Sequence, residues 1–229
     1  MNACIKRIIL DIKDLDKSPI ENIYYFPDED DIHNGYALII GPENTPYQYG
    51  NYLFNFKFTE EYPFNPPKVT YLSNDGITRF NPNLYRNGKV CLSILNTWTG
   101  EKWSACQSIR SVLITLQMTL NEYPLLNEPG IVRPKYDNEI NLYNEILYYK
   151  NIEFTILHYL LFPNTIPVKN EEIKDIIKNK FIENRDNILE YIEKNINFKK
   201  NISLLNIYDL KTYVNYDYLL KKYNKLKLN

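Results

Sequence analysis

A cysteine and an asparagine lie eight positions apart in the segment 79–92, which reads Arg-Phe-Asn-Pro-Asn-Leu-Tyr-Arg-Asn-Gly-Lys-Val-Cys-Leu. They are Asn83 and Cys91. A thiol can carry an acyl group as a thioester, and a nearby carboxamide can donate hydrogen bonds to the oxyanion that forms when an amine attacks it. The pair therefore predicts an acyl-transfer centre. The alternatives are a buried cysteine that only fills space and an asparagine that only stabilises the turn after Pro82.

The overall composition excludes several classes of function. Of the 229 residues, 44% are hydrophobic and 24% are charged, which is typical of a folded, soluble protein. The net charge of -1 gives no global attraction to nucleic acid or to an anionic membrane. No run of about 18 apolar residues and no signal-peptide pattern is present. We therefore expect no nucleic-acid partner and no membrane partner.

The cysteines indicate the compartment. Cys4, Cys91 and Cys106 are an odd number without paired metal spacing, so we expect neither a disulfide framework nor a metal site. A reducing compartment follows, which is the cytoplasm, with the nucleus as an alternative. The heavy use of Asn, Ile, Lys and Tyr is typical of an A/T-rich genome. If that genome is viral, the expected location is the host cytoplasm.

The elements that must position Asn83 and Cys91 are predicted from hydrophobic periodicity. Residues 5–15 have the spacing of an amphipathic helix, and 108–120 and 171–196 have the same pattern, as do the residues after Asp137. Residues 23–57 form short apolar clusters separated by turn residues, which predicts an antiparallel meander. Within it, residues 52–58 alternate like a half-buried strand. Strands followed by helices indicate the α+β class.

Three motifs occur in a fixed order: Gly-Pro-Glu-Asn-Thr-Pro-Tyr at 41–47, Tyr-Pro-Phe-Asn-Pro-Pro-Lys-Val at 62–69, and the spacing from Asn-Pro-Asn to Cys91. Together they resemble the ubiquitin-conjugating enzyme family over roughly residues 1–160. Three features resemble its Z-type branch. Asn81 stands where His is usual, Cys91 is followed by Leu-Ser-Ile-Leu-Asn-Thr-Trp-Thr-Gly, and residues 127–130 read Asn-Glu-Pro-Gly.

The resemblance implies that Cys91 accepts ubiquitin, or a ubiquitin-like modifier, as a thioester from an activating enzyme. The acyl group then passes to a substrate lysine or to a ligase cysteine. ATP is consumed upstream, so no cofactor is expected on this chain. Asn83 would stabilise the oxyanion or hold the loop that carries the cysteine, and Asn81 would brace that loop. Glu128 is preferred over Asn127 as the acid that orients the incoming lysine. Its alternative role is that of a surface acid beside a Pro-Gly turn.

The resemblance also implies two docking surfaces. Pro63, Phe64 and Ala105 would contact a ubiquitin ligase, with Phe64 as the apolar anchor. In many relatives the position of Ala105 is proline, which puts docking of common ring-type ligases in question. Lys6 and Arg7 on the first helix would face an acidic surface of the activating enzyme. The alternative for these two charges is a solvated helix face.

The expected organisation is a catalytic core at residues 1–162, built on a four-stranded antiparallel sheet flanked by helices, and a helical extension at 163–229. Two rival hypotheses stay open. In the first, the chain is a catalytically inactive variant that only binds ubiquitin or a ligase. In the second, the extension is a recruitment module and the conjugating domain is its passenger.

Overall fold

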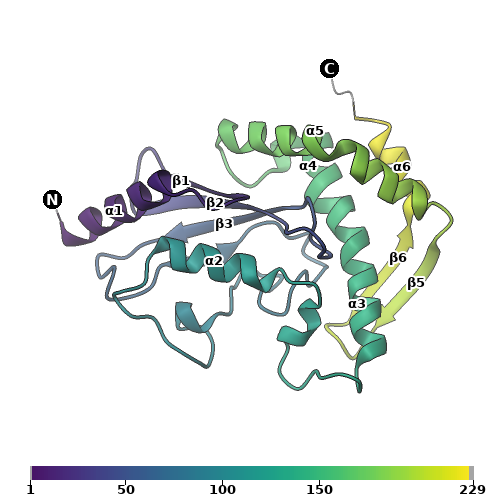
Figure 1. Cartoon of the computed structure of the whole chain (residues 1–229), viewed down its shortest axis with the longest axis horizontal. Coiled ribbons are helices and arrows are strands. Elements are labelled where there is room, and N and C mark those ends of the chain that lie inside the picture. Colours follow the sequence, from purple (N-terminus) through teal and green to yellow (C-terminus); the bar gives the residue numbers. More distant parts are fainter. Residues whose placement is uncertain (1, 227–229) are drawn as a thin grey trace.

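The computed structural model describes residues 2–226 and has the predicted α+β fold (Figure 1). Helix α1 (Ala3–Lys17) comes first, as the periodicity of 5–15 predicted. Four strands follow it: β1 (Ile23–Pro27), β2 (Asn34–Ile40), β3 (Asn51–Lys57) and β4 (Lys68–Tyr71). They pair in chain order as one antiparallel sheet, with Ile23 opposite Ile39 and Phe54 opposite Tyr71. The predicted meander is therefore confirmed.

Further helical elements follow the sheet, and the three longest of them lie where helical patterns were predicted. In chain order they are η1 (Ser93–Leu95), α2 (Ile109–Thr119), η2 (Pro124–Asn127), α3 (Asp137–Lys150), η3 (Asn151–His158), α4 (Tyr159–Leu161), η4 (Pro163–Thr165), α5 (Glu171–Lys194) and α6 (Tyr216–Tyr223). Helices α2 and α5 confirm the patterns at 108–120 and 171–196. No helix within residues 2–226 is long and apolar enough to cross a membrane.

The η3 segment is π-helical, and side chains of β3 hold it in place. Tyr52 donates from its hydroxyl to Asn151 Oδ1 at 2.8 Å, and Asn51 Nδ2 donates to the Thr155 carbonyl at 2.7 Å. The backbone before β3 approaches this helix closely, since a Cβ on Gly50 would lie 1.8 Å from Asn151 Oδ1. The glycine is therefore required by the close contact between the sheet and this helix.

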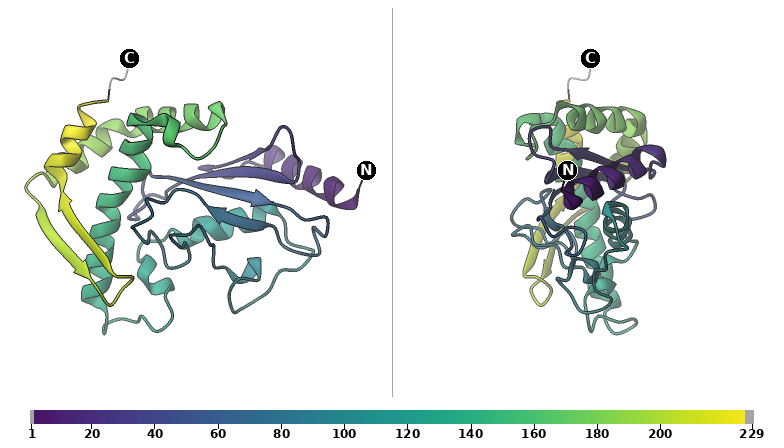
Figure 2. Two further views of the ribbon diagram at one scale, coloured as in Figure 1. Left: turned by 180° about the vertical axis from the view of Figure 1, so that it is seen from behind. Right: turned by 90° about the vertical axis from the view of Figure 1, so that its left-hand side faces the viewer.

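The extension is not wholly helical, contrary to the prediction. Between α5 and α6 it contains a hairpin of β5 (Lys199–Leu204) and β6 (Leu210–Asn215), which pair antiparallel. Figures 1 and 2 show this hairpin lying along α3. Along each strand of the hairpin, residues that face the core alternate with residues that face solvent. Four of the residues that face the core are buried: Ile202, Leu204, Leu210 and Val214. That period of two was the available sequence signal.

Both faces of the sheet are buried, so the prediction of a half-buried β3 was wrong. Tyr52, Leu53 and Phe54 are consecutive and all fully buried. The inner face packs in one core with α2 and α3. The outer face, which includes Leu38, Ile40 and Leu53, packs in a second cluster with four side chains of the extension: Ile166, Val168, Ile173 and Ile177. The start of the extension therefore supplies a layer that the sheet needs.

The rest of the extension joins the main core. Phe181, Ile188 and Ile192 of α5 are buried in the same cluster as the inner face of the sheet, as are the inward residues of the hairpin. Figures 1 and 2 show α5 crossing over the end of α3. The buried side chains of residues 163–226 all belong to clusters that also contain residues of the core, so the extension and the core stabilise each other.

Shortening one buried side chain of the extension tests this dependence. We expect Ile173→Ala to lower the free energy of unfolding by about 3 kcal/mol, because Ile173 is fully buried against the sheet. The matched control is Ile182→Ala on the same helix, where the side chain is 41% exposed and the change should stay within about 0.5 kcal/mol. Urea unfolding of both variants gives the comparison. Equal, small changes would show that α5 does not support the sheet.

Candidate functional site

Two hydrogen bonds, each with a backbone carbonyl as acceptor, hold Cys91 and Asn83 together. The Cys91 N–H donates to the Asn83 carbonyl at 2.9 Å, and Asn83 Nδ2 donates to the Cys91 carbonyl at 2.8 Å. Neither residue lies in a helix or a named strand, so this reciprocal pair fixes their separation. The side-chain amide of Asn83 thus holds the segment that carries the cysteine, which is one of the two roles expected for it.

Asn81 braces the loop from below, as expected. It is fully buried, and its Nδ2 donates to the Tyr47 hydroxyl and to the Thr119 carbonyl, each at 2.8 Å. Its Oδ1 accepts the N–H of Asn83 at 2.9 Å. Burial raises the pKa of Tyr47 well above its usual value, so the hydroxyl stays neutral and donates to the Phe80 carbonyl at 2.8 Å. Both N–H groups and the oxygen of the Asn81 amide are hydrogen-bonded within the protein, so none is left to contact a reacting group.

A buried arginine that the sequence analysis did not select holds the same loop. Arg79 Nε donates to the Asn81 carbonyl at 3.0 Å, and its Nη2 donates to the Pro82 carbonyl at 2.7 Å. The guanidinium carbon lies 3.3 Å from the centre of the Tyr85 ring, an aromatic stacking contact. Arg79 therefore clamps the two carbonyls that precede Asn83. The only signal in the sequence was its position two residues before Asn81.

Thr97 closes the other side of the cysteine segment. Its Oγ1 donates to the Val90 carbonyl at 2.8 Å and accepts the Leu92 N–H at 2.9 Å, so it bridges the residues on either side of Cys91. The Cys91 thiol donates to the Thr97 carbonyl, with 3.2 Å between Sγ and O. Cys91 is 3% exposed in this arrangement. The Thr97 carbonyl is thus the hydrogen-bond partner of the Cys91 thiol, which is almost completely buried.

The segment that carries Glu128 is joined to the loop around Asn81 by a hydrogen bond of Asn127, the residue before Glu128. Asn127 Nδ2 donates to the Thr119 carbonyl at 3.2 Å, the same carbonyl that accepts from Asn81. The Glu128 carboxylate accepts a hydrogen bond from the hydroxyl of Tyr208, in the turn of the β5–β6 hairpin. The role of Glu128 in orienting a lysine stays a prediction. Its contact with Tyr208 of the extension was not predicted from the sequence.

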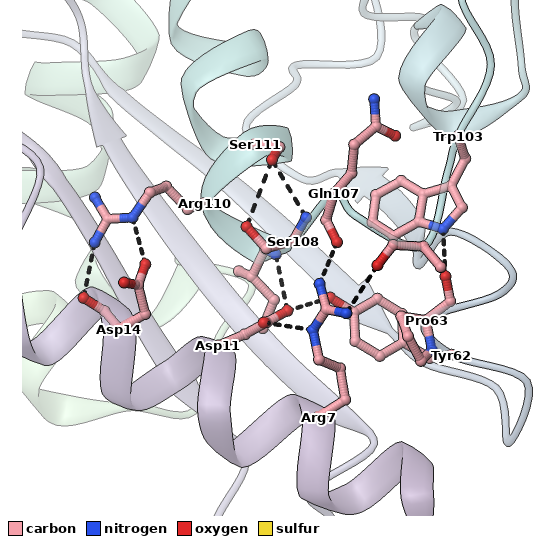
Figure 3. Close-up of polar contacts among 12 residues, drawn as sticks. Arg7, Asp11, Asp14, Tyr62, Pro63, Trp103, Gln107, Ser108, Arg110 and Ser111 are labelled. Carbon is pink, nitrogen blue, oxygen red and sulfur yellow. Dashed lines mark hydrogen bonds and ion pairs between the residues drawn. The ribbon is translucent and has the colours of Figure 1, made fainter.

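The predicted ligase-docking residues belong to two loops, and Figure 3 shows Pro63 of the first beside Trp103 of the second. Trp103 Nε1 donates to the Pro63 carbonyl at 2.7 Å and ties the 62–64 loop to the 103–105 turn. Phe64, the neighbour of Pro63 in the first loop, is 78% exposed. The Ala105 carbonyl accepts from Arg7 Nη1 at 2.8 Å. Pro63, Phe64 and Ala105 therefore form one region that includes an exposed aromatic side chain.

Arg7 turns inward, which differs from the predicted outward-facing charge. Its Nε lies 2.8 Å from the Asp11 carboxylate, and its two terminal nitrogens donate to the carbonyls of Ala105 and Gln107 (Figure 3). Asp11 is 6% exposed and also accepts from the Tyr62 hydroxyl. Because helix periodicity does not report long-range partners, the sequence analysis missed this connection. Lys6 is exposed on α1, as predicted.

Comparisons with known proteins match the sequence of this chain to one family. A family model described as Ubiquitin-conjugating enzyme matches residues 7–156, more than half of the chain. A protein of Xenopus tropicalis named ubiquitin-conjugating enzyme E2 Z is 43% identical over 160 residues, covering 69% of this chain and 51% of the relative. The Homo sapiens protein of that name is 40% identical over 184 residues, covering 80% and 51%. This chain thus spans about half the length of the Z-type relatives it matches.

The cover over the thiol can be tested by alkylation. Thr97→Val removes the hydroxyl that bridges Val90 and Leu92, and leaves the Leu92 N–H without its partner. We expect the Cys91 thiol to react with iodoacetamide about tenfold faster, the effect of losing roughly one partly buried hydrogen bond. Thr97→Ser retains the hydroxyl and should react like the parent. Cys106 is exposed and would also react, so all variants carry Cys106→Ser. Unchanged alkylation of Thr97→Val would contradict this role of Thr97.

Proposed function

Because this chain belongs to the Z-type branch of the ubiquitin-conjugating enzyme family, we propose that it accepts ubiquitin as a thioester on Cys91 and transfers it onward. The donor is an activating enzyme, and the acceptor is a substrate lysine or a ligase cysteine. The observation that carries this proposal is the reciprocal pair of hydrogen bonds between Cys91 and Asn83, a thiol and a carboxamide fixed to each other.

The proposed reaction has two acyl transfers. In the first, the Cys91 thiolate attacks the carbonyl carbon of the C-terminal glycine of ubiquitin, and the sulfur of the activating enzyme leaves as a thiolate. In the second, a lysine amine attacks the same carbon. The bond to Cys91 Sγ then breaks, the sulfur leaves as a thiolate, and the amine nitrogen loses a proton to solvent or to a nearby base. An isopeptide bond results.

Asn83 serves both the loop and the oxyanion in this proposal. A side-chain amide has two N–H donors, and the contact with the Cys91 carbonyl uses only one. The second can donate to the oxyanion of the tetrahedral intermediate when the amine attacks. Loss of one such donor typically slows a reaction about 100-fold or more. The fixed position of the amide supports this role, because a preorganised donor needs no rearrangement as charge develops.

Loading requires the thiol to become accessible. Cys91 is 3% exposed and its Sγ donates to the Thr97 carbonyl, so the segment around Thr97 must move aside before ubiquitin can reach the sulfur. Residues 96–100 are exposed, and no helix or strand includes them. The proposed motion thus involves a short exposed loop, while Arg79 and Asn81 keep the other side of the site in place.

The surface of the chain supports the proposed partners. Phe64 presents an exposed aromatic side chain beside the 103–105 turn, as a ligase-binding anchor would. Lys6 leaves a positive charge exposed on α1 for an acidic face of the activating enzyme. The guanidinium of Arg7 supports the ligase-docking surface, because it donates to the carbonyls of Ala105 and Gln107 behind the 103–105 turn.

A loading assay tests the function. The chain is incubated with ATP, ubiquitin and each main type of activating enzyme, and the products are separated on a non-reducing gel. We expect a thiol-sensitive adduct on the parent, a thiol-resistant oxyester on Cys91→Ser, and no adduct on Cys91→Ala. Cys106→Ser is the matched control, because that cysteine is exposed and outside the site, and it should load normally. No adduct on the parent would favour the inactive binding variant.

Discharge of the loaded protein to free lysine tests the proposed role of Asn83 at the oxyanion. Loaded Asn83→Ala should discharge to free lysine about 100-fold more slowly than the parent, because the oxyanion loses its proposed donor. Equal discharge rates would contradict that role and would leave Asn83 only as a support for the loop.

A further inference from the structure

One side chain of the extension reaches the loops around the cysteine. Tyr208 lies in the turn between β5 and β6, and its hydroxyl donates to the carboxylate of Glu128. Its backbone carbonyl accepts from Arg86 Nη2 at 2.5 Å. Its ring lies 4.9 Å from the guanidinium carbon of Arg79 and 6.1 Å from the ring centre of Tyr143. Each of these four partners belongs to the catalytic core.

The backbone at this turn is unusual for the residues that form it. The Leu210 N–H donates to the Ile207 carbonyl across the turn, and the two central residues have φ of +57° (Tyr208) and +48° (Asp209). A turn with two such residues favours asparagine and glycine, because other side chains are strained there. A tyrosine at its first central position is locally unfavourable. Its contacts with the catalytic core offset that strain, and the conflict points to a function for the side chain.

Tyr208 completes the environment of Arg79. The guanidinium of Arg79 has Tyr85 at 3.3 Å and Tyr208 at 4.9 Å, measured to the ring centres. Its N–H groups donate to the carbonyls of Asn81 and Pro82, directly before Asn83. Two aromatic rings around a planar cation restrict its movement. The turn of the extension therefore supports the residue that clamps the loop carrying Asn83.

We propose that Tyr208 is a positioning residue for acyl transfer from Cys91, because it holds the Glu128 carboxylate with its hydroxyl and the Arg79 guanidinium with its ring. This inference rests on the proposed function. Burial and the neighbouring Glu128 carboxylate raise the pKa of Tyr208, so its hydroxyl keeps its proton and remains a donor. The extension thereby contributes a side chain to the support of the reaction centre.

The experiment separates loading from discharge. Tyr208→Phe removes only the hydroxyl, so the ring contact with Arg79 remains. We expect it to load with ubiquitin within about twofold of the parent and to discharge to free lysine about tenfold more slowly, the effect of losing one hydrogen bond to a charged group. Tyr213→Phe is the matched control, since this tyrosine of β6 is 52% exposed, and it should load and discharge normally. Thermal unfolding of both variants checks that the fold is intact.

A second pair of variants shows whether the effect passes through Glu128. In a Glu128→Ala background the hydroxyl has no carboxylate to hold, so Tyr208→Phe should cause no further loss of discharge. Normal discharge of Tyr208→Phe would overturn the proposal, and so would the same tenfold loss in the Glu128→Ala background. Faster discharge of Tyr208→Phe would also overturn it, because Tyr208 would then be keeping the Glu128 carboxylate from the incoming lysine. A parent chain that never loads would instead overturn the proposed function, and this inference with it.

Discussion

The burial of both faces of the antiparallel sheet is the constraint on which the rest of the structure depends. Leu38, Ile40 and Leu53 point away from the main core and are almost completely shielded from solvent. Four of the buried residues that pack against them come from 166–177, and Tyr159 of the core is another, so removing the extension would uncover part of this apolar face. Because α5 is held there, the hairpin that follows it lies along α3, and the turn with Tyr208 reaches the loops around Cys91.

The loops around Cys91 are held by two buried polar side chains, Arg79 and Asn81, and by the exposed Thr97. Arg79 binds the carbonyls before Asn83, Asn81 ties the loop to Tyr47 and to the end of α2, and Thr97 bridges the residues around Cys91. Irregular backbone in a protein interior needs such partners, because an unpaired buried carbonyl or N–H is costly. On the side of Asn83 the backbone is held by Arg79 and Asn81, whereas on the other side Thr97 lies in the exposed segment 96–100, whose movement we propose uncovers the thiol.

Features that depend on nearby residues could be predicted from the sequence. The longer helices, the meander, the Asn83–Cys91 pair and the bracing role of Asn81 all follow from local spacing or from the family motifs. Features that depend on distant residues could not. Tyr208 is 80 positions from Glu128, and the guanidinium of Arg7 binds carbonyls about 100 positions away. The half-buried pattern expected for β3 failed for the same reason, since four of the side chains over its outer face come from the extension.

The central claim is that the extension and the conjugating core are one cooperative unit. Native-state hydrogen exchange at increasing urea tests it most directly, because it reports the free energy at which each segment opens. The amides of α5 around Ile177 and those of β3 around Leu53 should open with free energies within about 1 kcal/mol of each other. If α5 instead opened several kcal/mol below the sheet, while β3 kept its protection, the extension would be an independent appendage and the claim would be wrong.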